Sequence, residues 1–416
     1  MTLPLSGMMS TTMITDELGI GQSSPVCIGS APFRCLAEKP SGIIKYSDFY
    51  GKTYIVVPID TLYTWGFNST GQLGDNSTVS RSSPGTTAGG GTTWCQTSLS
   101  GVHAAAIKTD GTLWTWGSNS VGQLGDNSTV DRSSPGTTAG GGTTWCQVSG
   151  SSHTAAVKTD GTLWTWGFNT SGQLGDNSIT CRSSPVTTAG GGTTWCQVSS
   201  GGLHTAAIKS DGTLWTWGYN GSGRLGDNSL STRSSPVTTA GGGTDWCQVS
   251  GGISHTAAVK TDGTLWTWGA NFNGRLGDNS VASRRSPGTT AGGGTDWCQV
   301  SASSSNNTAA VKTDGTLWTW GVNTAGQLGN NSTVARSSPV TTAGGGTTWC
   351  QVSGGGSFSA AVKTDGTLWT WGCNGSGRLG DNSVVNRSSP GTTAGGGTTW
   401  RQAAAASCNM AAIKSS

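Results

Sequence analysis

The run Leu163-Trp164-Thr165-Trp166-Gly167 recurs seven times along the 416-residue chain, with Tyr in place of the first Trp in one copy. Its closing glycines lie 51, 50, 51, 51, 52 and 51 residues apart, at Gly66, Gly117, Gly167, Gly218, Gly269, Gly321 and Gly372. Two other landmarks keep this spacing: Trp-Cys-Gln, which becomes Trp-Arg-Gln in the last copy, and Ala-Ala-Val/Ile-Lys. A fixed period of this length indicates a repeat architecture with seven units.

Each unit is predicted to consist of short strands joined by turns. His153 to Lys158 has strand composition, Thr159-Asp160-Gly161 supplies a tight turn, and Leu163 to Gly167 follows as the partner strand. A polar loop is expected from Asp176 to Pro185, and a glycine-rich turn precedes the strand that begins at Trp195. No stretch shows helical periodicity, so the chain is predicted to be all-β, with three or four strands per unit.

Seven units of this kind predict a β-propeller, in which four-stranded blades are arranged around a central axis. Alternation along the strand places Trp164 and Trp166 on one face and Leu163 and Thr165 on the other, which suits layers between blades. The Ala-Ala pairs suit a narrow innermost strand. A linear solenoid is the alternative, and it would need a polar cap at each end.

The ends of the repeat region favour a closed ring. The chain stops after Ala411-Ala412-Ile413-Lys414, a strand without its Trp-Gly partner, whereas the repeats begin at Leu62 to Gly66, a partner without that strand. Pairing the two would complete a seven-bladed propeller of about 51-residue repeats and cover two sheet edges.

The repeats resemble those of the regulator-of-chromosome-condensation family. The resemblance rests on Leu-Trp-Thr-Trp-Gly-x-Asn-x-x-Gly-Gln-Leu-Gly, as in Leu113 to Gly125, and on Gly-x-x-His-Thr-Ala-Ala, as in Gly201 to Ala207. It implies a seven-bladed propeller over residues 62–416. The family includes a nucleotide exchange factor for a small GTPase, ubiquitin-ligase modules and a β-lactamase inhibitor, so it does not imply one function.

The first 52 residues differ in character and resemble the short leader of virion structural proteins from tailed bacteriophages. Thr2 to Gly7, Pro40 to Ile43 and the motif Ser47-Asp48-Phe49-Tyr50-Gly51 carry this resemblance. It implies an N-terminal attachment module at residues 1–52, joined by a linker at 53–61 to the propeller at 62–416. The motif Ser47, Asp48, Phe49, Tyr50 and Gly51 is then the virion-attachment motif.

Composition excludes several classes of partner. The net charge is +3, only 10% of residues are charged, and Lys and Arg are spread evenly, which argues against binding nucleic acid. No apolar run reaches 18 residues, so membrane insertion is not expected. Met1 to Thr12 lacks the pattern of a standard secretory signal.

Repeated polar residues are predicted to be structural. Six cysteines share one repeat position and are expected to be buried, too far apart for disulfides or a zinc site. Four histidines share another position and are expected to form structural hydrogen bonds (His103, His153, His204 and His255). Six Asp residues each precede an Arg by six positions and are expected to brace loops. No unique nucleophile–base pair stands apart from the repeat, so no enzyme activity, metal or cofactor is predicted.

The informative positions are those that differ between copies. They lie after Trp-Gly and after Asp-Asn-Ser, and the first set includes the binding candidates Phe67, Phe168, Tyr219 and Phe272. In a ring these loops lie on one face, where exposed aromatic side chains anchor partners. Neutral drift in tolerant loops is the alternative.

Two functions are compatible with these observations. The first is a non-enzymatic virion structural protein of the tail, baseplate or fibres, which presents the propeller to other virion proteins or to a host-surface glycan or protein. It would reside in the virion, and in the host cytoplasm during assembly. The alternative is a soluble propeller that regulates or inhibits a host protein.

Overall fold

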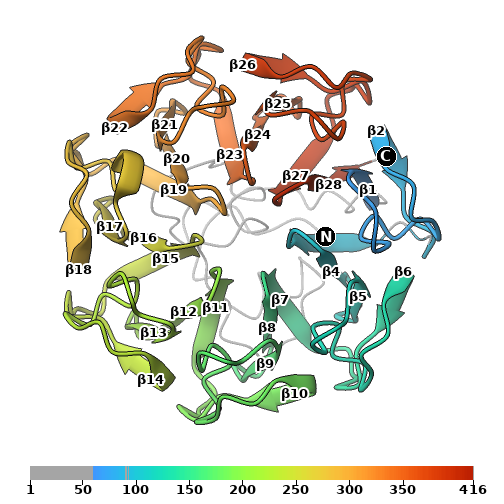
Figure 1. Ribbon diagram of the computed structural model, residues 1–416, viewed down its shortest axis with the longest axis vertical. Helices are drawn as coiled ribbons and strands as arrows, with labels where there is room; N and C mark the ends of the chain where they lie inside the picture. The colour runs from blue at the N-terminus through green and yellow to red at the C-terminus, as the bar shows by residue number, and fades with distance from the viewer. Residues whose placement is uncertain (1–59, 90, 92, 416) are drawn as a thin grey trace, which may run out of the picture.

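The computed structural model describes residues 60–89, 91 and 93–415. These residues form seven antiparallel sheets of four strands, arranged as blades around a central axis (Figure 1). The predicted seven-bladed propeller is therefore confirmed, and the linear solenoid is wrong. Within the described part of the chain, no helix is long and apolar enough to cross a membrane.

The strands fall into four positions from the axis outward. The first strands are β3 (Trp94–Leu99), β7 (Trp145–Gly150), β11 (Trp195–Ser200), β15 (Trp246–Gly251), β19 (Trp297–Ala302), β23 (Trp349–Gly354) and β27 (Trp400–Ala405). The second strands are β4 (His103–Lys108), β8 (His153–Lys158), β12 (His204–Lys209), β16 (His255–Lys260), β20 (Asn307–Lys312), β24 (Phe358–Lys363) and β28 (Asn409–Ser415).

The third and fourth strands complete the blades. The third strands are β1 (Asp60–Gly66), β5 (Leu113–Gly117), β9 (Leu163–Gly167), β13 (Leu214–Gly218), β17 (Leu265–Gly269), β21 (Leu317–Gly321) and β25 (Leu368–Gly372). The fourth strands are β2 (Arg81–Thr86), β6 (Arg132–Thr137), β10 (Arg182–Thr187), β14 (Arg233–Thr238), β18 (Arg284–Thr289), β22 (Arg336–Thr341) and β26 (Arg387–Thr392). Blade 1 comprises β3–β6, blades 2 to 6 follow in chain order, and blade 7 comprises β27, β28, β1 and β2.

The innermost strand is not the one that the sequence suggested. The Trp-Cys-Gln strands lie nearest the axis and contact one another around the ring, whereas the Ala-Ala strands are second (Figure 1). Ala155 and Ala156 of β8 are fully buried, one on each face of the blade. A second strand is covered by both neighbouring blades, and this double burial explains the small side chains better than a narrow axis does.

A second correction concerns the outer edge of each blade. The predicted loop from Asp176 to Pro185 overlaps a strand: Arg182–Thr187 is the fourth strand β10 and pairs with β9. Its register shifts between Arg182 and Val186, around Pro185. Proline lacks the N–H that a central strand needs, so it is tolerated at an outer edge strand with an irregular ladder. Its polar, half-buried side chains hid the strand.

The ring closes as predicted. Strand β1 pairs with β28 over its whole length, from Asp60 opposite Ser415 to Gly66 opposite Asn409. The Ser415 hydroxyl also donates a 2.7 Å hydrogen bond to the buried Asp60 carboxylate, and Arg401 lies 3.6 Å from its other oxygen. Blade 7 therefore joins the two ends of the repeat region.

Indole rings fill the layers between blades. Trp195, Val198 and Trp217 of blade 3 pack against Val157 and Leu163 of blade 2. Within one third strand, Trp164 and Trp166 face the preceding blade and Leu163 faces the next one, as the alternation predicted. The Trp195 ring meets those of Trp215 and Trp217 edge to face, at centroid distances of 6.3 and 6.0 Å.

The inner tryptophan of each pair is also a hydrogen-bond donor between blades. Trp217 Nε1 donates to the carbonyl of Gln173 in the preceding blade at 2.9 Å. Gly175 lies directly over that ring with φ +69°, and a Cβ there would sit 2.6 Å from Nε1. The second glycine of Gly-Gln-Leu-Gly is therefore required by both backbone conformation and indole contact.

The innermost strands are linked by side chains. The Oε1 of Gln147 accepts a hydrogen bond from the N–H of Val198 in the next blade at 2.7 Å. The equivalent bond between blades 7 and 1, in which Gln402 Oε1 accepts from the Thr97 N–H at 3.0 Å, closes the ring. A serine two residues further on accepts a second N–H, as Ser250 does from Ala302 at 2.9 Å. Blade 7 carries Ala404 there, so its seam with blade 1 lacks this hydroxyl.

Replacing Ala404 with Ser should raise the thermal unfolding midpoint, because the added hydroxyl would accept the Leu99 N–H across the seam. One such bond contributes about 0.5–1.5 kcal/mol. The reverse change, Ser250→Ala, should lower the midpoint by a similar amount. Calorimetry of both variants checks this, and a lower midpoint for Ala404→Ser would contradict it.

Candidate binding face

The antiparallel order of the strands divides the connections between two faces. The loop face carries the connections from first to second strands and from third to fourth strands; the latter are residues 67–80, 118–131, 168–181, 219–232, 270–283, 322–335 and 373–386. The turn face carries the Asp-Gly turns and the glycine-rich connections between blades. The predicted candidates Phe67, Phe168, Tyr219 and Phe272 all lie on the loop face.

The exposed large apolar side chains are confined to the loop face among the described residues. They are Phe67, Val79, Val102, Val130, Ile179, Tyr219, Leu230, Ile253, Phe272, Val281, Val334, Val384 and Val385. Most lie in the two variable stretches that the sequence singled out. Exposed apolar side chains that gather on one face are candidates for contact with a partner.

The four aromatic candidates are not equivalent. Phe272 is 63% exposed, Tyr219 39% and Phe67 38%, whereas Phe168 is half-buried. Tyr219 and Phe272 lie on adjacent blades 3 and 4, Phe168 on blade 2 and Phe67 on blade 7. The structure therefore brings Tyr219 and Phe272 to neighbouring positions and leaves Phe67 in another sector.

The loops beneath these side chains are braced by polar contacts. In blade 2, Asn169 Oδ1 accepts the Leu174 N–H at 2.9 Å, and its amide nitrogen donates to the carbonyl of Ser178 at 3.2 Å. The Asp176 carboxylate pairs with Arg182 at 3.0 Å. Equivalent Asp–Arg pairs occur in five other blades, which confirms the predicted bracing role (Asp75–Arg81, Asp126–Arg132, Asp227–Arg233, Asp278–Arg284 and Asp381–Arg387).

The histidines form hydrogen bonds between blades, as predicted. His153 Nε2 lies 2.7 Å from Thr205 Oγ1 of the next blade, and that hydroxyl donates to the carbonyl of Gln173. Because the hydroxyl has a single proton, it must accept from Nε2–H, which assigns the tautomer. Burial lowers the pKa of His103 to about 4 and of His153 and His255 to about 3, so these rings are neutral at pH 7.

The prediction that the six repeated cysteines are buried is wrong. Cys95, Cys146 and Cys247 are exposed, and Cys196, Cys298 and Cys350 are intermediate. Each Sγ lies 3.2–3.4 Å from a carbonyl of the second strand. The position lies on the innermost strand, which is an edge strand of each described sheet, so these side chains are less covered than those of the second strand.

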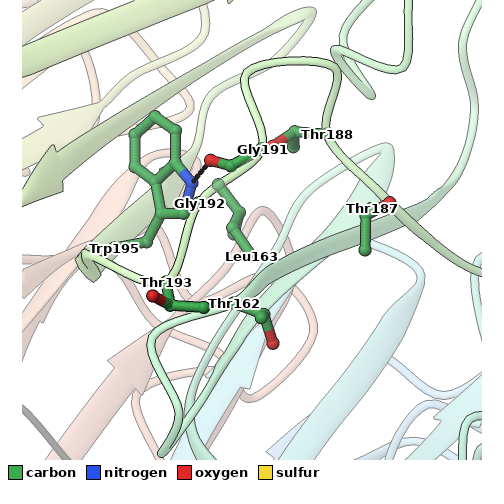
Figure 2. Close-up of a pocket in the computed structure, with 8 residues that line it drawn as sticks. All are labelled: Thr162, Leu163, Thr187, Thr188, Gly191, Gly192, Thr193 and Trp195. Atoms are coloured by element: carbon green, nitrogen blue, oxygen red, sulfur yellow. Dashed lines mark hydrogen bonds between the residues drawn. The ribbon is translucent and has the colours of Figure 1, made fainter.

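The cavities of the turn face follow the repeat. One of about 190 Å³ lies between blades 2 and 3, with Leu163 and Trp195 among the lining residues, and the Trp195 indole donates to the Gly191 carbonyl at 3.1 Å (Figure 2). An equivalent of about 250 Å³ lies between blades 1 and 2. Ligand pockets usually measure about 300–1,000 Å³. No group of three His, Cys, Asp or Glu in the described residues could hold a metal.

Sequence reasoning missed three arginines on the loop face. Arg224, Arg275 and Arg378 occupy the position that Gln holds in the other four copies. They are 5%, 3% and 9% exposed. Arg224 donates to the carbonyl of Ile253 at 2.8 Å and Arg378 to that of Ser407 at 3.0 Å, each in the next blade. The replacement of Gln by Arg in three of the seven copies was the feature of the sequence that could have identified them.

Comparison with known proteins identifies relatives of the repeat. The profile of the RCC1-like domain matches residues 16–343, and that of the regulator of chromosome condensation (RCC1) repeat matches residues 349–378 and 365–412. The protein RCC2 homolog of Danio rerio is 37% identical over 139 residues, which cover 33% of this chain and 28% of that protein.

Two further matches complete the comparison. The mitochondrial RCC1 domain-containing protein RUG3 of Arabidopsis thaliana is 30% identical over 215 residues, covering 46% of this chain and 44% of its own. The chain thus spans less than half the length of these two curated relatives. The crystal structure of Prp20p from Saccharomyces cerevisiae superposes with a TM-score of 0.76 at 19% identity, over 87% of this chain and 92% of that one.

Acidification should destabilise the ring through its neutral histidines. The folded-state pKa lies below the unfolded value of about 6.5, so this stability is present above pH 6.5 and lost as pH falls toward about 4. Between pH 7 and pH 5 the loss is about 2 kcal/mol per histidine. The free energy of unfolding, measured with urea at a series of pH values, should depend less steeply on pH in His153→Asn, because one fewer proton is taken up on unfolding. The variant Thr193→Ala should keep the pH dependence of the parent. An unchanged slope in His153→Asn would contradict this assignment.

Proposed function

The chain belongs to the RCC1-like domain family, and from that premise we propose that it is a protein-binding module whose loop face docks a partner protein. The observation that carries this proposal is the confinement of exposed large apolar side chains to one face. A regulator or inhibitor that acts by binding fits this arrangement better than an enzyme, because the loop-face side chains vary from blade to blade while the cavities repeat.

Two further observations support the proposal. The loops are held by Asn and Asp–Arg contacts, so little conformational entropy is lost when a partner binds. Prp20p, which has the same fold, is described as having binding properties to Gsp1p and histones. The fold therefore offers a precedent for protein binding, and the partner of this chain depends on its own loop residues.

Replacing Phe67, Tyr219 and Phe272 with Ser should abolish partner binding and leave the unfolding midpoint unchanged. The aromatic rings supply apolar contact area, and other copies already have Ser at equivalent positions (Ser118 for Phe67 and Tyr219, Ser69 for Phe272). Quantitative mass spectrometry of proteins cross-linked to the full chain in its source cells measures the effect. Losses of binding of at least roughly tenfold are expected for the hot-spot aromatics.

The matched control lies on the opposite face. Thr143, Thr193 and Thr244 are exposed in the glycine-rich connections, and their replacement by Ala should leave the cross-linked partners unchanged. If both triple variants keep all partners, or if both lose the same ones, the loop face is not the docking surface.

A virion role is a second proposal, supported by the leader resemblance alone. Its motif, Ser47 to Gly51, lies outside the described residues, and the relatives named above include no virion protein. Mass spectrometry of purified phage particles should detect this polypeptide at a fixed ratio to tail proteins. Its absence from washed particles would remove the proposal.

A further inference from the structure

Three consecutive blades of the loop face carry arginines that lack acidic partners. Arg224 lies in blade 3, Arg275 and Arg285 in blade 4, and Arg336 in blade 5; we call this group the arginine sector. Within residues 60–89, 91 and 93–415, none of the four forms an ion pair. The neighbouring carboxylates, Asp227 and Asp278, are already paired with bracing arginines.

Three of the four members depart from the residue that other copies hold, and the fourth has lost its acidic partner. Gln is the common residue at the positions of Arg224 and Arg275, and Ser is the residue in all six other copies at the position of Arg285. Arg336 keeps the bracing position, but Asn330 replaces the Asp that would pair with it. The sector therefore adds positive charge beyond what the repeat needs to fold.

The buried arginines cluster around the tips of adjacent loops. Arg275 contacts Asn306 of blade 5, and Arg224 has a guanidinium Nε without a hydrogen-bond partner within the described residues. Burial and the charge of Arg224 lower the pKa of Arg275 to about 10, so the two charges lie close enough to repel. A buried cation without a counter-charge is costly, and an anion that approaches it is bound strongly.

Aromatic rings lie beside two of these charges, and exposed aliphatic side chains lie on the same three blades. The Tyr219 ring lies 4.8 Å from the Arg224 guanidinium, and the Phe272 ring lies 5.6 Å from that of Arg275. Leu230, Val281 and Val334, one from each of the three blades, are exposed. The sector therefore combines positive charge with apolar contact surface.

We propose that the arginine sector is the docking site for an acidic protein segment that carries apolar side chains between its carboxylates. This inference rests on the proposed function and adds the chemistry of the partner. Carboxylates would bind the guanidinium groups, which are suited to planar bidentate contacts, and apolar side chains would cover Phe272 and the exposed aliphatic residues.

A protein segment fits this surface better than nucleic acid. Phosphate contacts alone would use the exposed Arg285, but the exposed Leu230, Val281 and Val334 offer nothing to a sugar–phosphate backbone. Arg224 and Arg275 are recessed, so a carboxylate on a flexible side chain can reach them more easily than the surface of a duplex. The net charge of the whole chain, +3, is also too small for a general nucleic-acid surface.

The test is selection of a displayed random dodecapeptide library on the full chain, repeated on Arg224→Gln/Arg275→Gln/Arg285→Ser. Each substitution restores the residue of other copies, so the unfolding midpoint should stay within about 2 °C of the parent. Arg378→Gln in blade 6 is the matched control: Arg378 also has no acidic partner among the described residues, but the neighbouring Arg387 is paired with Asp381, so blade 6 has no second unpaired arginine. Binding of the most enriched synthetic peptide is then measured by fluorescence polarisation.

We expect the parent to enrich peptides rich in Asp and Glu with Leu or Phe between them. The best peptide should bind the triple variant at least ~10-fold more weakly and Arg378→Gln within about twofold, and 0.5 M NaCl should weaken it. Peptides without excess acid, or with equal affinity for the triple variant, would overturn the proposal.

Two outcomes separate this inference from the proposed function. The first is a peptide that binds the arginine triple variant as tightly as the parent but no longer binds Phe67→Ser/Tyr219→Ser/Phe272→Ser. This result would refute the arginine sector and keep the loop face as a docking surface. Peptides that depend on no loop-face residue would refute both. A labelled 20-nucleotide single strand is the last arm: if it binds the parent and is lost on the arginine triple variant, while no acidic peptide is enriched, the sector binds nucleic acid and the proposal fails.

Discussion

The structure depends on hydrogen bonds that each blade can complete only with its neighbour. The innermost strand of every blade has N–H groups that its own sheet leaves unpaired, and Gln Oε1 of the preceding blade accepts one of them, as Gln147 does from Val198. The inner tryptophan also donates to a carbonyl of the preceding blade, as Trp217 does to Gln173. Buried N–H groups must find acceptors, so no blade is complete alone. The seventh blade must therefore meet the first, and the pairing of β1 with β28 makes this possible.

This mutual dependence explains why the copies are so alike and where they can differ. A residue that reaches into the next blade has to match seven interfaces of one geometry, so Trp, Gln and the second Gly of Gly-Gln-Leu-Gly recur. The loops after Trp-Gly are held from below by Asn169 and its equivalents, and they present exposed side chains such as Tyr219 and Phe272. Side chains at the tips can change without disturbing closure. The loop face is therefore where a partner-specific surface can arise on this ring.

Most of the fold could be predicted from the sequence, because the period and the strand alternation both follow from inter-blade packing. Ring closure was predictable from the incomplete first and last copies, and so was the structural role of His153 from its repetition. The order of strands from the axis was not, since Ala155 suits any position that is covered on both sides. Arg182–Thr187 was missed because edge strands tolerate Pro185 and polar side chains. Of the candidate site, the aromatic residues could be named as candidates from their variation between copies, whereas Arg275 replaces Gln inside the otherwise constant Gly-Gln-Leu-Gly motif, which marks the position as structural.

The arginines bear on how a repeat protein acquires a binding site. The same position functions with Gln in four copies, so closure of the ring does not require Arg there. Gln173 uses its Oε1 to accept the N–H of Ser171, a bond that a guanidinium cannot replace, since it has no acceptor. Arg224 instead crosses to the Ile253 carbonyl and leaves its Nε without a partner among the described residues. The exchange loses an accepted bond and buries a charge, and it gains the bond to the Ile253 carbonyl of the next blade, whereas Gln173 leaves its Nε2 without a partner among the described residues. Under the proposed docking, an anionic partner would supply the counter-charge that the described residues do not provide for Arg224.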